Sequence, residues 1–139
     1  MATLSLHADL TDMATVREFV AACGRELGLS QEMIEAFQLA VDEACTNAVE
    51  HGYEGRGGEI EVTMEAEADH VCATVRNWGI PFDPAAVPIP DVNAPLEKRS
   101  LGGLGVFLIR QLMDHVEFGF DPVKGNTLTM IKHRNRREP

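Results

Sequence analysis

Leu-Ala-Val-Asp-Glu-Ala-Cys-Thr-Asn-Ala-Val-Glu-His-Gly-Tyr, residues 39 to 53, is the stretch on which the fold depends. If it is helical, Glu43, Asn47 and His51 lie one turn apart and form a polar stripe. Apolar residues recur at three- and four-residue spacing on another face, namely Ile34, Phe37, Val41, Ala44 and Ala48. This spacing is typical of a helix that packs against a core, and we expect it to run from Ser30 to about His51.

The polar stripe has two interpretations. A solvated helix face shows the same pattern, and the stripe taken alone favours that reading. In the other interpretation, the carboxylate of Glu43 lies one turn from the carboxamide of Asn47, so that a general base stands beside an oxygen ligand for a divalent cation. The choice between them depends on the rest of the chain.

The composition is that of one acidic globular domain. The chain has 139 residues, of which 45% are hydrophobic, and a formal net charge of −10. This length is sufficient for a sizeable core, so we expect a single domain over residues 1–139. The negative charge disfavours direct binding to nucleic acid and to anionic membranes. No stretch approaches the length of a membrane span, and we expect no signal peptide.

The cysteines and the C-terminus give weaker indications. Cys23, Cys45 and Cys72 are widely spaced and lie in apolar or helical contexts. They are expected to be buried, reduced thiols in a cytoplasmic protein. Four basic residues fall in the last eight positions, and we expect residues 132–139 to form a frayed basic tail.

Hydrophobic periodicity places further elements along the chain. Alternating apolar residues predict strands at residues 3–8, 59–65, 71–75, 116–120 and 127–133. A helix is predicted from residue 11 or 12 to about Gly28, and another begins inside the glycines that follow residue 101. Because the strands are grouped in hairpins, the order predicts an α+β fold, a mixed, mostly antiparallel sheet with about three helices on one face.

A long loop separates the two halves of the predicted sheet. Residues 78 to 101 hold five of the seven prolines and follow no periodicity. Loops of this length in a compact domain are usually functional lids or disordered inserts. We expect a lid over about residues 80–101.

The glycines after this loop suit an anion site. Gly102, Gly103 and Gly105 stand at the start of a predicted helix, where free backbone N–H groups and the helix dipole attract phosphate. A flexible hinge is the alternative reading. The lysine of a Walker A loop is missing, and no strand precedes the glycines, so the two common phosphate-binding loops do not apply.

The strand at 71–75 leads into a turn with polar character. Asn77 offers both a carbonyl and an amide to the edge of a purine, and Gly79 permits unusual backbone angles. By itself this stretch is better explained as a structural turn.

These features in this order resemble the GHKL (Bergerat-fold) ATP-binding superfamily, and within it the small anti-sigma-factor serine kinases of bacterial partner-switching systems. Residues 43–53 look like the N box. Residues 77–84 are similar to the first glycine box, and residues 101–114 to the second. The resemblance covers roughly residues 5–133.

The resemblance implies a Bergerat fold that binds ATP or ADP with Mg²⁺. It implies that Asn47 coordinates the metal and that Glu43 is the base for an attacking serine hydroxyl. Gly79 would let the backbone pass close to adenine, and His51 would support the box structurally. The phosphates would be held under the lid by three glycines, Gly102, Gly103 and Gly105.

Two positions depart from the pattern of the family. Asn77 stands where an aspartate usually accepts the adenine amino proton, and its Oδ1 can accept that bond without the charge. Charge-assisted bonds are about twice as strong as neutral ones. We therefore predict that the neutral Asn77 weakens ATP binding and that Asn77→Asp would raise the affinity for ATP. Asn126 stands where a threonine is usual, with Thr127 next, and this contact is left unassigned.

Two functions are compatible with this resemblance. The first is a serine protein kinase that phosphorylates a STAS-domain anti-anti-sigma protein and sequesters a sigma factor or similar regulator, with a homodimer as one possible assembly. The second is a non-catalytic nucleotide-binding module of the same fold that acts through protein contacts. Asn77 and the long loop expected to form the lid favour the second function, and the pair of Glu43 and Asn47 favours the first.

Overall fold

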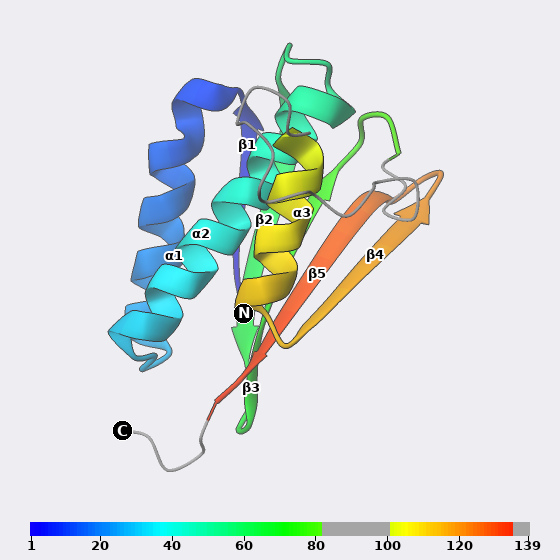
Figure 1. Ribbon diagram of the computed structural model, residues 1–139. Coiled ribbons are helices and arrows are strands. Elements are labelled where there is room, and N and C mark those ends of the chain that lie inside the picture. Colours follow the sequence, from blue (N-terminus) through cyan, green and yellow to red (C-terminus); the bar gives the residue numbers. More distant parts are fainter. Residues whose placement is uncertain (82–100, 135–139) are drawn as a thin grey trace.

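The structure, a computed structural model, describes residues 1–81 and 101–134 (Figure 1). Nearly all of the predicted lid and the last five residues of the predicted tail lie outside the described residues. In the described part, no helix is both long and apolar enough to span a membrane.

A five-stranded sheet forms one layer of the molecule. Its strands are β1 (Ala2–Ala8), β2 (Gly58–Ala66), β3 (His70–Asn77), β4 (His115–Asp121) and β5 (Gly125–His133), in the spatial order β1-β2-β3-β5-β4. All four pairings are antiparallel. The predicted α+β class is confirmed. The strands are antiparallel because, as predicted, most of them follow one another in hairpins.

The second layer consists of three helices on one face of the sheet (Figure 1). They are α1 (Met13–Glu26), α2 (Gln31–Asn47) and α3 (Leu101–Leu112), with α2 between the other two. A short 3-10 turn, η1 (Leu10–Asp12), precedes α1. Gly28 has a φ of +73°, which stops α1 as the sequence predicts. Ser30 then caps α2 by accepting from the backbone N–H of Met33 at 3.2 Å.

The predicted second helix changes character at its end. Its α-helical part stops at Asn47 and continues as a π-helical turn, η2 (Ala48–Gly52). The backbone N–H of Tyr53 accordingly donates to the carbonyl of Ala48, five residues earlier, at 2.9 Å. The predicted helix therefore ends close to His51 as expected, but its last five residues form a π-helical turn and not a regular α-helix.

The core lies between α2 and the centre of the sheet. The predicted apolar face of α2 is buried, with Phe37 and Val41 fully inaccessible. On the sheet side, alternate residues of β2 and β3 meet this face, namely Ile60, Val62, Met64, Val71, Ala73 and Val75. The alternation seen in the sequence thus separates a buried face of the sheet from a polar one.

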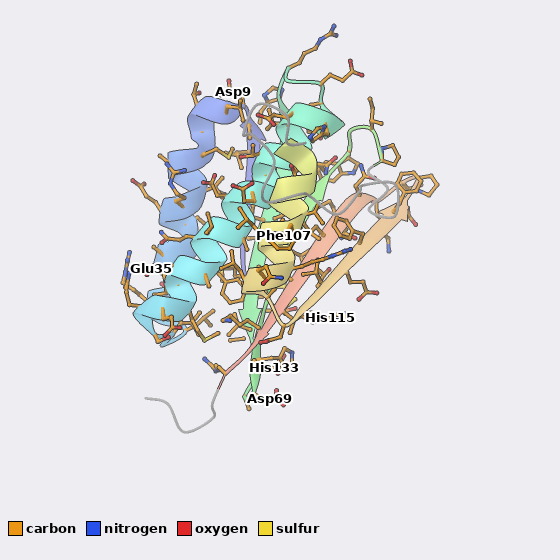
Figure 2. All side chains as sticks on the ribbon, viewed as in Figure 1. Asp9, Glu35, Asp69, Phe107, His115 and His133 are labelled. Carbon is orange, nitrogen blue, oxygen red and sulfur yellow. The ribbon has the colours of Figure 1, made fainter. Side chains whose placement is uncertain are left out.

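The C-terminal segment is more ordered than expected. Lys132 lies within β5, and its Nζ donates to the carbonyl of Leu112 at the end of α3, at 3.1 Å. Arg134 donates to the carbonyl of Leu27 at the end of α1, also at 3.1 Å. The prediction of a frayed tail is wrong for residues 132–134, because the unpaired carbonyls of two helix ends bind these cations. Figure 2 places His133 and Asp69 at the end of the molecule opposite Asp9.

Candidate active site

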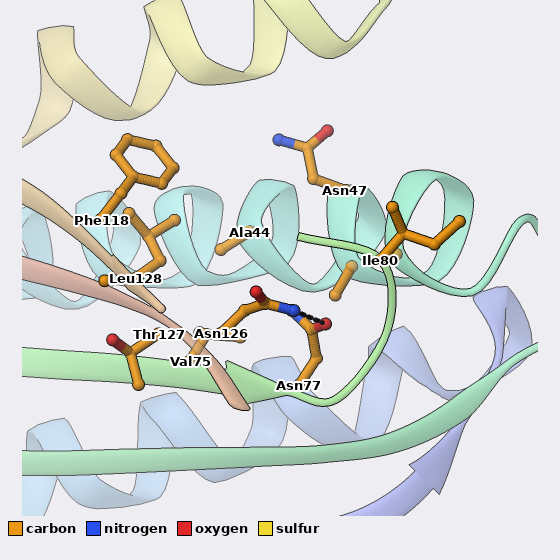
Figure 3. A pocket seen from close by; sticks show the side chains of 12 residues that line it. Ala44, Asn47, Val75, Asn77, Ile80, Phe118, Asn126, Thr127 and Leu128 are labelled. Carbon is orange, nitrogen blue, oxygen red and sulfur yellow. Dashed lines mark hydrogen bonds between the residues drawn. The ribbon is translucent and has the colours of Figure 1, made fainter. Parts of the chain in front are cut away.

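A pocket lies between α2 and the β3, β5 and β4 part of the sheet (Figure 3). Its walls are largely apolar and include Ile80 and Phe118, while Asn47, Asn77 and Asn126 contribute polar groups. Apolar walls with a few polar groups are typical of sites that bind the base of a nucleotide. Two of the residues predicted from separate motifs, Asn47 and Asn77, therefore line the same pocket.

The carboxamides of Asn77 and Asn126 are joined by a small hydrogen-bond network (Figure 3). Asn77 Oδ1 accepts from the backbone N–H of Gly79 at 3.0 Å and from Asn126 Nδ2 at 3.1 Å. Asn126 Nδ2 also donates to the carbonyl of Gly79 at 3.0 Å. Both lone pairs of Asn77 Oδ1, the oxygen expected to accept from adenine, thus have partners within the protein.

Asn126 is the site residue that the sequence left unassigned. It pairs with Asn77 across β3 and β5, and its side chain is buried at 8% exposure. A signal was present in the sequence, since a buried strand that opens with a carboxamide directly after a hairpin glycine is unusual. The identity of its partner, 49 residues away, is decided by the strand pairing alone.

Position 79 requires a glycine because there is no room for a side chain, and not because its backbone angles are unusual. A side chain at this position would overlap the carbonyl oxygen of Gly52, and the φ of Gly79 is not among the positive ones. The next residue, Ile80, donates its backbone N–H to that carbonyl at 2.8 Å. The close approach of two glycines therefore fixes the turn after β3 against the end of η2.

The start of α3 lies against the polar stripe of α2. A Cβ added at buried Gly105 would be 3.0 Å from Glu43 Oε2 and 3.3 Å from Asn47 Nδ2. Any larger residue at position 105 would crowd both polar groups. Gly102 and Gly103 lie in the first turn of α3, which begins at Leu101, one residue before the glycines.

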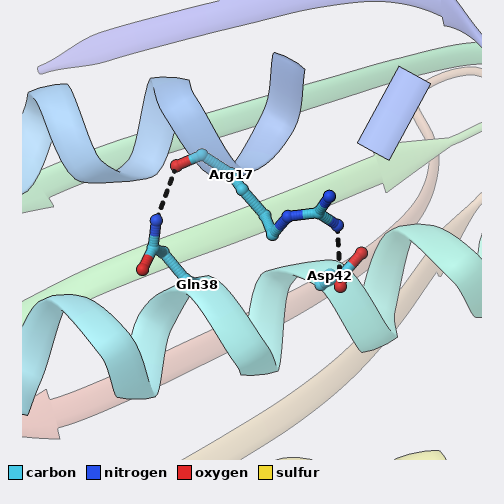
Figure 4. A network of polar contacts seen from close by, with 3 residues as sticks. All are labelled: Arg17, Gln38 and Asp42. Carbon is cyan, nitrogen blue, oxygen red and sulfur yellow. Dashed lines mark hydrogen bonds and ion pairs between the residues drawn. The ribbon is translucent and has the colours of Figure 1, made fainter. Parts of the chain in front are cut away.

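Glu43 is half-buried, and its surroundings favour the protonated form. Burial raises the pKa of the Glu43 carboxyl, and the nearby carboxylates of Asp42 and Glu50 raise it further. Asp42 forms an ion pair with Arg17 of α1 at 3.2 Å, and Gln38 donates to the carbonyl of Arg17 at 3.0 Å (Figure 4). A carboxylate with a raised pKa is better suited to take a proton near neutral pH.

The donor set fits a magnesium ion held mainly through phosphates. The described residues contain no group of three or more His, Cys, Asp or Glu that could hold a metal. Mg²⁺ commonly uses one or two protein oxygens together with phosphate oxygens and water. The Asn47 carboxamide, which lines the pocket and lies close to Gly105 of α3, can supply one such oxygen.

Comparisons with known proteins agree with this geometry. A family model described as histidine kinase-like ATPase domain matches residues 6–132. The serine-protein kinase RsbW of Bacillus cereus (strain ATCC 10987 / NRS 248) is 32% identical over 139 residues, covering 97% of this chain and 86% of the relative. RsbW of Bacillus mycoides (strain KBAB4) is 31% identical with the same coverage.

A solved structure shows the same fold. The crystal structure of the RsbU and RsbW domains of Rv1364c from Mycobacterium tuberculosis matches with a TM-score of 0.61 at 20% identity. The match covers the whole of this chain and 35% of the other, so the present chain spans about a third of that multidomain protein.

Proposed function

Because the chain belongs to the histidine kinase-like ATPase domain family, we propose that it is an ATP-dependent serine protein kinase. In this proposal it phosphorylates a STAS-domain anti-anti-sigma protein and sequesters a sigma factor or a related regulator in a partner switch. The observation that carries the proposal is the convergence of Glu43, Asn47 and Gly105 beside the pocket that Asn77 and Asn126 line.

Each of these residues has a role that phosphoryl transfer requires. The serine oxygen of the substrate attacks the γ-phosphorus, its proton passes to Glu43, and the bond to the bridging oxygen of ADP breaks. Asn47 would hold Mg²⁺, which would supply the positive charge that phosphoryl transfer needs at the phosphates. The backbone at the glycine-rich start of α3 would contact the same phosphates. Positioning and charge neutralisation supply most of the catalysis in such reactions.

The proposal is tested by incubating the purified protein with Mg-ATP and a STAS-domain protein from the same genome. We expect phosphoserine on the STAS protein by mass spectrometry. Glu43→Gln should lower the transfer rate by at least about a hundredfold, the usual size of a general-base contribution, while ATP still binds. Glu35→Gln is the matched control, because Glu35 is exposed on α2 and bonds only to Gln31 among its described partners (Figure 2).

A second function is favoured by the neutral Asn77. The protein would then bind nucleotide and partners without transferring phosphate. Absence of phosphoserine, with ATP demonstrably bound, would reject the kinase in favour of this module. Glu43→Ala separates the two in a reporter strain, because the switch fails if Glu43 is the base, whereas a module keeps both partner binding and switching.

A further inference from the structure

An exposed leucine borders Glu43 on the face of α2 that points away from the sheet. α2 lies between α1 and α3 and buries its opposite face in the core (Figure 1). Leu39 is 43% exposed, whereas the other large apolar side chains of α2 are buried. Side chains one turn apart on a helix have Cβ atoms about 5–6 Å apart, so Leu39 is a direct neighbour of Glu43.

The side of α2 that faces α1 is already occupied by polar contacts. Asp42 forms its ion pair with Arg17 of α1 at 3.2 Å (Figure 4). Glu35 lies two turns before Asp42 and therefore falls on the same side of the helix. Leu39 and Glu43 lie beyond these contacts, and the carboxylate of Glu43 lies against α3. The open surface next to Glu43 is therefore the one that Leu39 covers.

Transfer to a protein serine brings the substrate chain onto this surface. If Glu43 is the base, the serine oxygen has to come within about 2.6–3.2 Å of its carboxylate. Successive Cα atoms of a chain are about 3.8 Å apart, so a residue close to the serine in the substrate sequence can span the distance from Glu43 to Leu39. Leu39 offers that residue an apolar contact, because its own side chain is half outside the core.

The charges along α2 favour a basic substrate segment. Glu32 is exposed and lies two turns before Leu39, in line with it along the helix. Neither α2 nor η2 contains a lysine or an arginine. Complementary charge steers a partner to a surface and fixes its register. A segment with an apolar residue near its serine and a basic residue farther along complements this face of α2.

We propose that Leu39 is a specificity-determining residue for the protein substrate. An apolar side chain near the acceptor serine packs on Leu39, and a basic residue beyond it faces Glu32. The inference rests on the kinase activity proposed above and adds the class of segment that the kinase accepts. Leu39 does not line the pocket, so its contribution is to the binding of the protein and not of the nucleotide.

Steady-state kinetics with a STAS-domain protein from the same genome tests the contact with Leu39. We expect Leu39→Ala to raise the KM for the protein at least about fivefold, because apolar surface buried by the substrate is lost, with kcat and the KM for ATP within about twofold. Leu39→Met should restore the KM for the protein, because methionine offers a similar apolar surface. Leu10→Ala is the matched control, because Leu10 is 48% exposed but belongs to η1. A KM that Leu39→Ala leaves unchanged, or that Leu10→Ala raises equally, overturns the inference.

Charge reversal tests the second contact. Glu32→Lys should raise the KM for the protein about threefold at low salt, and the effect should disappear at high salt because exposed charges are screened. Glu18→Lys is the matched control, because Glu18 is an exposed carboxylate on α1. Equal effects of the two reversals would assign the change to net charge and overturn the role of Glu32.

A double-mutant cycle connects Leu39 to the substrate. Mass spectrometry locates the phosphorylated serine, and the apolar residue nearest to it in the substrate sequence is replaced by alanine. Combined with Leu39→Ala, this change should raise the KM by less than about twofold further, because the two side chains form one contact. Fully multiplicative effects would overturn the contact and leave the kinase intact. Absence of transfer by the unmodified protein would overturn the proposed function and this inference together.

Discussion

Under the proposed function, Glu43 is the residue at which the stability of the fold and the phosphoryl-transfer chemistry oppose each other. Its raised pKa results first from burial and then from the carboxylates of Asp42 and Glu50. The same conditions that make it a better base make the folded protein carry a charge in an unfavourable place. A neutral residue of the same shape would relieve that cost and remove the proposed general base.

We therefore predict that Glu43→Gln raises the free energy of unfolding at pH 7. Because the folded pKa lies above its ordinary value of 4.5, ionisation favours the unfolded state as the pH rises through and beyond that value. The gain is below about 1 kcal/mol, because solvent screens a half-exposed carboxylate. Urea titrations at pH 7 and pH 4 measure it. A gain of equal size at both pH values would show that the charge of Glu43 is not its cause.

At the scale of elements, Tyr53 joins three segments that frame the pocket. It follows η2 directly, its hydroxyl donates to the carbonyl of Glu59 in β2 at 2.6 Å, and it accepts from the backbone N–H of Trp78 at 2.9 Å. Its ring lies where any side chain at Gly58 would be placed. The position of the turn that carries Asn77 thus depends on a residue that does not itself line the pocket.

Tyr53→Phe tests this connection, because it removes the hydroxyl and keeps the ring. We expect a loss of about 1 kcal/mol in the free energy of unfolding, the usual net value of a neutral hydrogen bond. We also expect weaker ATP binding, because the turn after β3 is held less firmly. Urea unfolding and titration calorimetry on the same preparation provide both readouts. A stability loss with unchanged ATP affinity would mean that Tyr53 does not position the turn.

At the scale of the whole molecule, the end of the chain holds the helical layer to the sheet. Arg134, just after β5, donates to the carbonyl of Leu27 at the end of α1 through its side chain. Its backbone N–H donates to the carbonyl of Asp69 in the β2–β3 hairpin at 2.9 Å. The side chain of Lys132 likewise donates to the carbonyl of Leu112 at the end of α3. Cations at helix C-termini also interact favourably with the helix dipole.

Arg134→Met should lower the free energy of unfolding by about 1 kcal/mol, because it keeps most of the aliphatic stem and removes the donor to α1. Thermal unfolding with calorimetric detection measures the change. Lys124→Met is the matched control, because Lys124 is exposed in the β4–β5 turn. Equal effects of the two substitutions would assign the change to net charge and not to the contact with Leu27.

The sequence by itself determined the secondary structure, the α+β class and the residues of the polar stripe, because periodicity and turn residues act over a few positions along the chain. It also indicated the glycine-rich start of α3. Tertiary structure alone decided the π-helical turn before Tyr53, the close approach of Gly79 to Gly52, the pairing of Asn126 with Asn77 and the anchoring of Arg134. Those features depend on contacts between residues far apart in sequence, which only the packing of the sheet against its helices brings together.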